Sequence, residues 1–396
     1  MQELKTLQSL VAAPFVTCSF GGETFGLSNR MNPITGVRDI NYITSLVVDK
    51  KASGTVNTYQ LSMTYTIEPG SDPNYIDYII SKSLDRKIVF TYGDMSQPEY
   101  SYVKEQAIIT NIVPTVSISS NSIQYTISAT SSVALSYAIS RPFQKRSNVK
   151  PSDLILEVLY ANNSGLLKLF TGMRDKQQVL AKGWIARNDI PVHIEAILDK
   201  SPLEYIRILV SKMRAADGSF FAMIIHDEPD NTDGPYFEIV NSNLYQGQGN
   251  TYSLDIDVGY PGKVPVFSFS ASQNTSLALI TAYQDKMDRG RIIDINDDGS
   301  LLTTSTPSLA IRNGAASTEL YNWWRAMTSY PITASLSTRG LIKPSILCDY
   351  IRINVLFFGQ KYNYSGLYMV TGQKDTINAQ GYRTDLTLTR VKGDNV

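Results

Sequence analysis

Apolar and polar residues alternate along two stretches of this chain more regularly than elsewhere. Between Thr55 and Ile67, tyrosine, leucine and methionine alternate with threonine, glutamine and serine. Between Thr384 and Val391, leucines alternate with aspartate and threonine. Because successive side chains of a strand point to opposite faces, a period of two indicates a strand with one buried and one wet face. We therefore predict a strand in each stretch.

The strand near the end of the chain has a predicted partner immediately before it. Gly366 to Thr371 is rich in β-branched and aromatic residues, which favour strands. A polar link from Gly372 to Arg383 separates the two strands. The pattern predicts a β-hairpin with a long loop, and this loop is a candidate contact for a neighbouring molecule.

The first third of the chain contains further strand signals and one helix signal. Asp72 is a fair N-cap with Pro73 at the first helical position, and apolar residues then recur at helical spacing up to Ile80. The other predicted strands are Phe15 to Phe20, Asn41 to Asp49, Lys87 to Tyr92, Glu99 to Pro114 and Ser122 to Ala129. This part is predicted to be a β-barrel or sandwich with one short helix against it.

The pattern changes after Ser131. Pro151-Ser152-Asp153 opens one helix and Pro202 opens a second. We predict that the second helix ends at Asp217-Gly218, because glycine accepts the left-handed cap. Two strands follow, at Phe220 to His226 and Tyr236 to Val240. The acidic, turn-rich loop Asp227 to Gly234 joins them, so the middle of the chain is predicted to be an α/β or α+β unit.

The last third is again rich in strand signals. Two helices are predicted, one from Leu277 to Arg289 and one that opens at Ser317 and closes before Pro331. The predicted strands before the terminal hairpin are Tyr252 to Val258, Val264 to Ser270, Ile332 to Thr338 and Tyr350 to Phe358. No residue-level repeat links this part to the first third. The only argument for a duplication is that both parts are rich in predicted strands.

These patterns predict an α+β fold, mainly β, with two antiparallel β-barrel domains flanking an α/β connector domain. The first β-barrel domain is placed at residues 1–138 and the connector at residues 139–234. The second β-barrel domain is placed at residues 235–263 and 318–396. Whether residues 264–317 return to the connector stays open.

Composition favours a subunit of an assembly over a nucleic-acid-binding protein. Lys plus Arg and Asp plus Glu both number 36, so the net charge is zero and binding driven by bulk charge is not expected. Charged residues make up only 18% of the 396 residues, and there are 24 tyrosines. Tyrosine is favoured at half-buried contacts with a partner, although β-rich proteins also carry more of it.

No targeting or cross-linking framework is evident. Met1 to Ala13 lacks the basic segment and the long apolar core of a signal peptide, and no stretch approaches the ~20 apolar residues needed to span a bilayer. Cys18 and Cys348 lie far apart in the sequence. A disulfide between them is one alternative, but synthesis in a reducing cytosol is the simpler interpretation. We therefore predict no membrane anchor.

The search for catalytic, metal or cofactor residues selects none. His193 and His226 stand at no metal spacing from Cys or Glu and are interpreted as ordinary histidines. Asp294 to Gly299 matches half of a calcium loop, but Ser305 occupies the twelfth position, so an Asp-Gly turn is preferred. Gly247-Gln248-Gly249 lacks the third glycine of a dinucleotide fingerprint. Asp227 and Glu228 are interpreted as solvated, and the chain is predicted not to be an enzyme.

Three places in the chain together resemble a known layout. The first is the proline-marked joint Ser140-Arg141-Pro142-Phe143, which is followed by the helix from Ser152. The second runs from the helix start Ser201-Pro202-Leu203-Glu204-Tyr205-Ile206 to Ala216-Asp217-Gly218-Ser219-Phe220-Phe221. The third comprises the helix Glu319 to Met327, the strand Ile332 to Thr338, the turn Lys343-Pro344, the strand Tyr350 to Leu356, and Gly366 to Thr371.

In order and spacing these segments resemble the baseplate hub protein of contractile-tailed bacteriophages. That family is related to the N-terminal part of type VI secretion spike proteins, and has two tail-tube-like β-barrel domains with a connector between them. The turn at Lys343-Pro344 departs from the pattern, because Ser345 follows it where glycine is usual.

The resemblance implies a structural role without cofactors. Three chains would form a ring that adapts the six-fold tail tube to the three-fold cell-puncturing spike around a central channel. The implied partners are two further copies of the chain, the tail tube protein, the central spike protein and other baseplate proteins. DNA would pass through the channel without sequence-specific binding. The implied location is the virion tail baseplate, after assembly in the host cytoplasm, with Gly21 to Arg38 and Asp227 to Gly234 as further candidate contact loops.

Two other functions remain open at this point. One is the hub of a related contractile injection system, of the tailocin or secretion type. A fused spike would mark the secretion type, and none is expected because the last predicted strand ends at Val391. The other is a carbohydrate-binding or wall-degrading tail protein, which would need a carboxylate pair in a cleft or an exposed aromatic platform.

Overall fold

The structure is a computed structural model of the 396-residue chain. It describes residues 5–6, 13–27, 40–82, 87–94, 102–131, 140–161, 170–213, 215, 221–228, 235–241, 251–258, 266–273, 293–295, 301–303, 332–343 and 345–393. In this part of the chain no helix is long and apolar enough to cross a membrane.

The first third forms the six predicted strands together with three short strands that were not predicted. The strands are β1 (Lys5–Thr6), β2 (Pro14–Phe20), β3 (Glu23–Gly26), β4 (Ile40–Asn41), β5 (Ile43–Lys51), β6 (Thr58–Thr66), β7 (Lys87–Asp94), β8 (Tyr102–Ser117) and β9 (Ser122–Ser131). The predicted helix is also present as α1 (Tyr75–Lys82), with Ile76, Ile79 and Ile80 buried. It starts two residues after Pro73, and the Asp72 side chain accepts a hydrogen bond from the Asn74 backbone N–H at 2.8 Å.

The middle of the chain mixes helices with short hairpins. Its helices are α2 (Pro151–Leu159), a 3-10 turn η2 (Thr171–Met173), α4 (Lys176–Lys182) and α5 (Pro202–Lys212). Its strands are β10 (Arg141–Phe143), β11 (Arg146–Val149), β12 (Val192–Ile194), β13 (Ile197–Lys200), β14 (Phe221–His226) and β15 (Tyr236–Asn241).

Helix α5 shows how local sequence sets an element. Ser201 and Glu204 form a capping box, in which each side chain bonds the other residue's backbone N–H. The helix ends at Lys212, so the predicted end at Asp217-Gly218 is wrong. Met213 already has an extended backbone and caps the helix through its N–H to the Val210 carbonyl, so no glycine is needed to end it.

The last third supplies the remaining strands. They are β16 (Thr251–Val258), β17 (Val266–Gln273), β18 (Ile293–Ile295), β19 (Leu301–Thr303), β20 (Ile332–Arg339), β21 (Tyr350–Phe357), β22 (Gln360–Lys361), β23 (Gly366–Asn378) and β24 (Gly381–Gly393). The helices predicted at 277–289 and 317–330 lie outside the described residues.

The terminal hairpin is tight, and the predicted long loop from Gly372 to Arg383 is wrong. Most of that stretch belongs to β23 and β24, which pair as far as Asn378 and Gly381. The Asn378 side chain accepts hydrogen bonds from the backbone N–H groups of Gln380 and Gly381. The loop prediction failed because Gln373 and Asp375 are polar residues, which are typical of loops, but here they lie in a strand and point into the protein.

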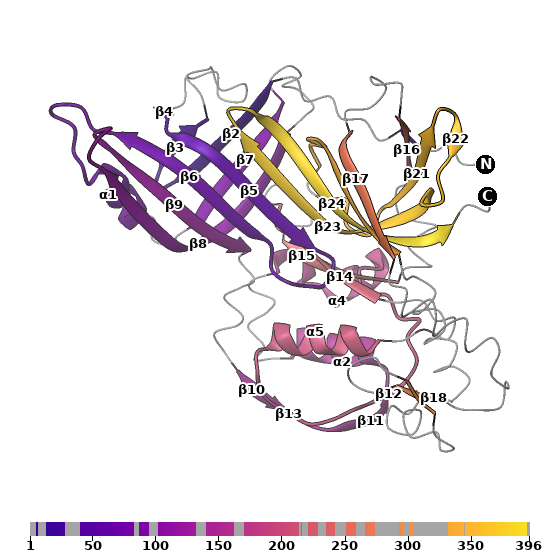
Figure 1. Cartoon of the computed structure of the whole chain (residues 1–396). Coiled ribbons are helices and arrows are strands. Elements are labelled where there is room, and N and C mark those ends of the chain that lie inside the picture. Colours follow the sequence, from indigo (N-terminus) through magenta and orange to yellow (C-terminus); the bar gives the residue numbers. More distant parts are fainter. Residues whose placement is uncertain are drawn as a thin grey trace.

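Sixteen of the described strands form one mainly antiparallel sheet, so the chain is mainly β as predicted. The order is β1-β16-β21-β23-β5-β6-β9-β8-β7-β2-β3-β4, and β24 leads from β23 to β20 and β17. Three neighbouring pairs are parallel, namely β1–β16, β16–β21 and β3–β4. Figure 1 shows these strands as one broad body with α2 and α5 below it.

One pairing in this sheet joins the two ends of the chain. Residues 45–51 of β5 pair antiparallel with residues 372–378 of β23. We call this pairing the seam. It makes the strands of the first third and those of the last third a single sheet, and sequence patterns did not predict it.

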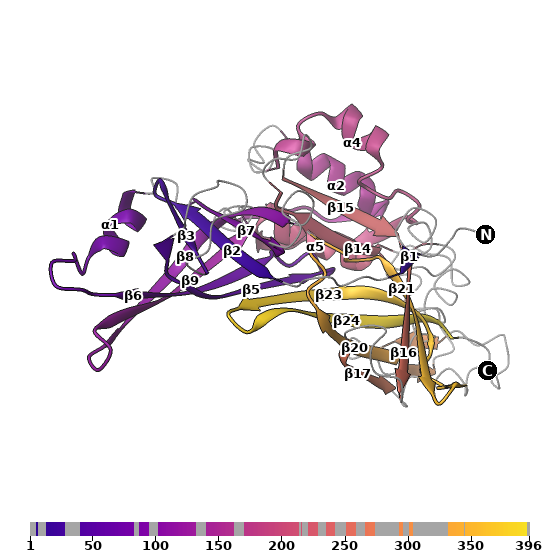
Figure 2. The ribbon, with the colours of Figure 1, turned by 90° about the horizontal axis from the view of Figure 1, so that it is seen from above.

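The buried apolar residues form three clusters. The first cluster lies among β2, β5–β9 and α1, and the second among α2, α5 and the β14–β15 hairpin. The third lies among β16, β20, β21, β23 and β24. The β14–β15 hairpin contributes to two clusters, because Met223 and Ile225 face the second whereas Ala222 and Ile224 face the third. The predicted boundary at residues 234 and 235 therefore falls inside this hairpin, which lies between the helices and the sheet in Figure 2.

Candidate functional site

Eight strands around the seam form an uninterrupted antiparallel run. Their order is β8-β9-β6-β5-β23-β24-β20-β17. Four of them precede the connector in sequence and four follow it. One face of this run packs on the first and third apolar clusters, and the opposite face points outward.

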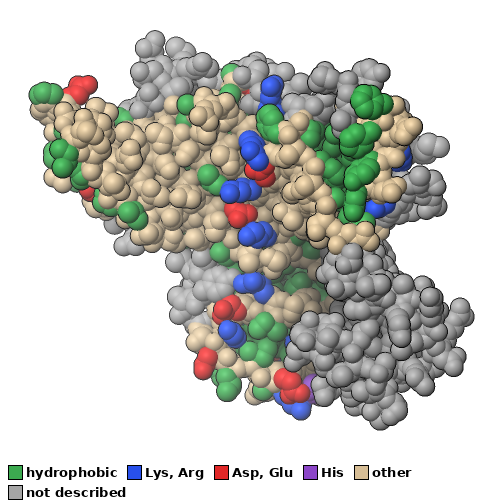
Figure 3. All heavy atoms as spheres, viewed as in Figure 1, with side chains coloured by type: hydrophobic (Ala, Val, Ile, Leu, Met, Phe, Trp, Pro, Cys, Tyr) green, Lys and Arg blue, Asp and Glu red, His purple; other side chains and the backbone are tan. Residues whose placement is uncertain are grey.

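The outward face is made mainly of hydroxyl and amide side chains. We call it the polar face. Its residues include Ser45, Thr58, Gln60, Ser62, Thr64, Gln124, Thr126, Ser128, Thr130, Ser270, Ser335, Thr376, Asn378, Thr387 and Thr389, which the strand registers place on one side. Figure 3 views this face, and neutral polar side chains and backbone cover most of it. Such a surface is wettable without attracting either sign of charge.

Charged groups on the polar face gather in one narrow row beside the seam (Figure 3). Arg383 contacts Asp385 at 2.8 Å, and Lys51 contacts Asp49 at 3.5 Å. Lys374 stands between the two aspartates in the strand register. Because these pairs are exposed, each stabilises the fold only slightly.

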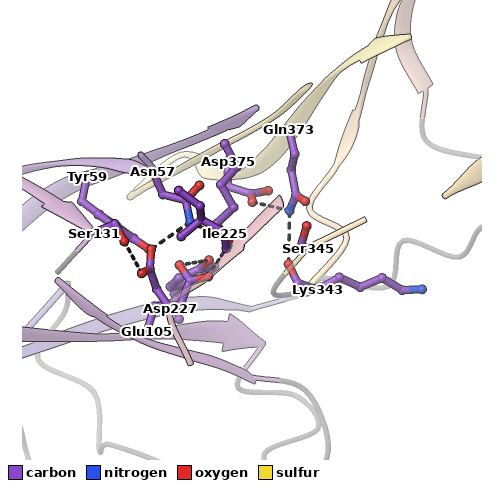
Figure 4. A network of polar contacts seen from close by, with 12 residues as sticks. Asn57, Tyr59, Glu105, Ser131, Ile225, Asp227, Lys343, Ser345, Gln373 and Asp375 are labelled. Atoms are coloured by element: carbon purple, nitrogen blue, oxygen red, sulfur yellow. Dashed lines mark hydrogen bonds and ion pairs between the residues drawn. The ribbon is translucent and has the colours of Figure 1, made fainter. Parts of the chain in front are cut away.

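A buried polar cluster lies directly behind this row. The side chains of β5, β23 and β24 alternate, so the neighbours of the outward charges point inward. The cluster comprises Lys50, Asn57, Tyr59, Tyr92, Glu105, Ser131, Asp227, Gln373, Asp375 and Thr384. Figure 4 labels most of these side chains, among them Glu105, Asp227 and Asp375, which come together from segments far apart in sequence.

Lys50 and Glu105 form the ion pair of the cluster. The Lys50 ammonium donates to the Glu105 carboxylate, and the two residues are 2% and 1% exposed. The Tyr92 hydroxyl donates to the second oxygen of Glu105 at 3.0 Å. An ion pair held in this way resists solvent and salt, unlike the exposed row outside.

Hydrogen bonds of Asp227 join the connector to strands β6 and β9. It follows β14, and its carboxylate accepts hydrogen bonds from Asn57 at 2.8 Å, from Tyr59 at 3.1 Å and from Ser131. Its backbone carbonyl accepts from the Gln106 N–H at 3.0 Å. The prediction that Asp227 is solvated is wrong, because these hydrogen bonds hold it against β6 and β9 and it is only 2% exposed.

Asp375 and Gln373 of β23 form hydrogen bonds with β24 and with the segment that precedes β21. Asp375 accepts hydrogen bonds from Thr384 and Gln373. Gln373 also donates to the Lys343 carbonyl at 3.1 Å and accepts from the Ile346 N–H at 3.0 Å. The cluster therefore links all three apolar clusters at one place.

The charges within this cluster do not balance. Lys50 is the one cation in the contacts just described, against the carboxyls of Glu105, Asp227 and Asp375. Burial raises the pKa of Asp227 to about 6, and Glu105 adds to the rise while hydrogen bonds from Ser131 and Asn57 oppose it. Burial likewise raises the pKa of Asp375 to about 6, against hydrogen bonds from Thr384 and Gln373 and the charge of Lys50.

We expect the free energy of unfolding to fall as pH rises from about 4 to 6. The two carboxyls have a pKa near 3.8 when unfolded and about 6 when folded, so between about pH 4 and 6 the folded chain holds more protons. Each contributes a loss on the order of 3 kcal/mol across that range. Urea unfolding of the wild type and of Asp227→Asn from pH 4 to 7 measures it. The wild type should lose stability relative to the variant as pH rises, whereas parallel curves would contradict the prediction.

The other residues weighed from sequence form no reactive group. His193 contacts Ser147 and Glu195, each at 2.9 Å, and His226 contacts Glu238 at 3.3 Å and stacks on Tyr236. Among the described residues no three His, Cys, Asp or Glu side chains lie close enough together to hold a metal ion. The two cysteines are buried, and no disulfide joins them. Gly247 to Gly249 and most of Asp294 to Gly299 lie outside the described residues.

Solved structures show what the chain is similar to. The prophage MuSo2 43 kDa tail protein from Shewanella oneidensis matches with a TM-score of 0.52 and 10% identity, over 96% of this chain and 97% of that one. This chain has the fold of a phage tail protein. The similarity covers nearly the whole length of both chains.

Two further structures are similar at 10% identity. The tail protein from Neisseria meningitidis MC58 matches with a TM-score of 0.49, over 96% of this chain and 97% of that one. An E. coli component of the type VI secretion system, described as structurally similar to two T4 tail proteins, matches with a TM-score of 0.48, over 88% and 73%. No protein-family model and no curated protein matches the chain.

Proposed function

We propose that this protein is the structural hub of a contractile-tail baseplate. Three copies form a ring around a central channel, and the ring adapts a six-fold tail tube to a three-fold spike. The partners are the tail tube protein, the central spike protein and other baseplate proteins. The protein acts in the virion tail after assembly in the host cytoplasm, and it has no catalytic role.

The observation that carries this proposal is the antiparallel run of eight strands across the seam. Within it, β5, β6, β8 and β9 stand on one side of the seam and β17, β20, β23 and β24 on the other. One chain thus offers two four-stranded units. Three chains would offer six such units to a six-fold tube while keeping three-fold symmetry toward a spike.

The polar face suits the lining of a channel. Its hydroxyl and amide groups hold water, and its few charges partly neutralise one another in the seam row. A polyanion such as DNA would meet no strongly basic surface there and would slide without sequence-specific contacts. In the proposed ring this face points inward, and the connector lies outside it.

The mass of the protein in solution tests the proposal. We expect a species of three times the 44.0 kDa chain mass by light scattering, and a ring with a central hole by electron microscopy, alone or with tail tube and spike proteins of the same virion. A monomer under all of these conditions would contradict the hub function. Degradation of cell-wall material by the purified chain would contradict its non-catalytic part.

A further inference from the structure

The connector meets the sheet along one side of the β14–β15 hairpin. The apolar side chains that this hairpin places in the third cluster are Ala222, Ile224 and Val240. Beside them the Gly54 N–H donates to the Met223 carbonyl at 3.0 Å, and the Met223 N–H donates to the Ala52 carbonyl at 3.2 Å. A contact of so few apolar side chains opens more readily than a whole core unfolds. The polar groups at this boundary therefore weigh heavily in whether it stays closed.

Asp227 lies at the same boundary and presents a buried carboxyl to the sheet. The groups that donate to its carboxylate are the Asn57 amide and the hydroxyls of Tyr59 and Ser131 (Figure 4). The Gln106 N–H of β8 donates to its backbone carbonyl at 3.0 Å. All of these donors belong to the sheet side and are neutral, so they solvate the carboxylate without supplying a positive charge.

The charges that face Asp227 come from the sheet. The titratable groups around it and Glu105 are Lys50, Tyr59, Tyr92 and Asp375, with His226 and Glu228 beside it in sequence. Lys50 pairs with Glu105, and His226 contacts Glu238 within the hairpin. Burial raises the pKa of Tyr59 well above its usual value, so this hydroxyl stays neutral. An ionised Asp227 therefore faces the Glu105 carboxylate across the boundary, while the ammonium of Lys50 is paired with Glu105.

We propose that a proton-dependent contact holds the connector to the sheet: it stays closed when Asp227 is protonated and opens more readily when Asp227 is ionised. A protonated Asp227 keeps its contacts with Tyr59 and Ser131, because a hydroxyl accepts as well as donates. An ionised Asp227 adds a second buried negative charge beside Glu105, and opening of the boundary places that charge in water. This inference goes beyond the proposed function and does not depend on the ring, because every group in it belongs to one chain.

The direction of the pH effect follows from the closed and open states. Burial raises the pKa of Asp227 to about 6 in the closed state, whereas a solvated aspartate titrates near 3.8. Because the closed state holds the proton more tightly, the contact is firmest below about pH 4 and weakens as pH rises through 6. With these two pKa values, the equilibrium constant for opening rises roughly 50-fold from pH 4 to pH 7.

Hydrogen exchange of the full-length chain measures this opening. The backbone amides of Gly54, Gln106 and Met223 bond across the boundary, so they exchange when it opens. After correction for the intrinsic exchange rate at each pH, their protection should fall about 50-fold from pH 4 to pH 7 in the wild type. In Asp227→Asn the fall should be less than about three-fold, because asparagine does not titrate.

Asp375→Asn is the matched control. Its carboxyl is equally buried in the same cluster, but its partners Thr384 and Gln373 belong to the last third of the chain and not to the connector. Opening of the connector boundary leaves these contacts in place. The fall in protection at the three boundary amides should therefore be the same in Asp375→Asn as in the wild type.

A second variant keeps the test decisive where Asp227→Asn does not fold. Ser131→Ala retains the carboxyl and removes one donor that lowers its pKa, so the fall should extend to higher pH than in the wild type. A fall that persists in Asp227→Asn, does not shift in Ser131→Ala, or shrinks in Asp375→Asn would overturn the proposal. A three-copy ring whose boundary amides show no pH effect refutes this contact and leaves the hub function standing. A monomer that shows the effect supports the contact while the hub function fails.

Discussion

Replacing Lys50 by methionine is expected to destabilise the fold by about 3–5 kcal/mol, the range for breaking a buried ion pair from one side. The change leaves the buried Glu105 carboxylate without its cation. It also removes the positive charge that helps to hold down the pKa of Asp227 and Asp375. Urea unfolding followed by tryptophan fluorescence at pH 7 measures the loss.

The neighbouring residue provides a matched control. Lys51 stands next to Lys50 on the same strand, but its side chain is 59% exposed and its partner Asp49 is 3.5 Å away. Lys51→Met should cost less than about 0.5 kcal/mol. Adding Glu105→Leu to Lys50→Met should recover part of the loss, since the orphaned charge is then removed. Equal effects of Lys50→Met and Lys51→Met would show that burial of the pair does not matter.

Gly340→Ala is expected to destabilise the fold by about 3 kcal/mol, at the upper end of the range for over-packing a core. A Cβ at this position would lie 2.2 Å from Cγ of the Tyr382 ring. The ring cannot move aside easily, because it is buried and packs edge-on against Tyr92. The Gly340 N–H also donates to the Tyr382 carbonyl at 2.8 Å, which fixes the two backbones relative to each other. Thermal and urea unfolding measure the change.

A second substitution separates this steric effect from a general weakness of the site. In a Tyr382→Ala background Cγ and the rest of the ring are absent, so adding Gly340→Ala should cost less than about 1 kcal/mol. Gly359 offers a further comparison, because nothing lies within 4 Å of its Cβ position and only its positive φ opposes a side chain. Additive losses in the double variant would contradict the assigned clash.

The sequence predicted most strands because alternation and one-sided burial coincide in them. In Thr58–Thr66 the tyrosine, leucine and methionine side chains face the core, and the polar ones form part of the polar face. Pro202 likewise predicted the start of α5, which begins at that residue. In both cases the signal is local, and no distant contact overrides it.

The candidate site was missed because its signals are not local. Asp375 and Gln373 look like loop residues in the sequence, yet each is buried against partners on other strands. Asp227 looks like part of an acidic turn, and it is buried by Asn57, Tyr59 and Ser131, which precede it by about a hundred residues or more. The seam pairs residues more than 300 positions apart. Lys50 was missed as well, because the predicted strand ended at Asp49, whereas β5 continues through Lys51 and places Lys50 in the core.

The seam also bears on how this chain is made. Residues 45–51 leave the ribosome long before residues 372–378, their partners in the sheet. At ordinary translation rates of 5–20 residues per second, the edge of β5 waits on the order of 15–65 s for its neighbour. During that time a nascent chain exposes an edge that another nascent chain could occupy. Capture of this edge by a chaperone, or faster synthesis of the rest of the chain, would therefore protect the yield of this protein.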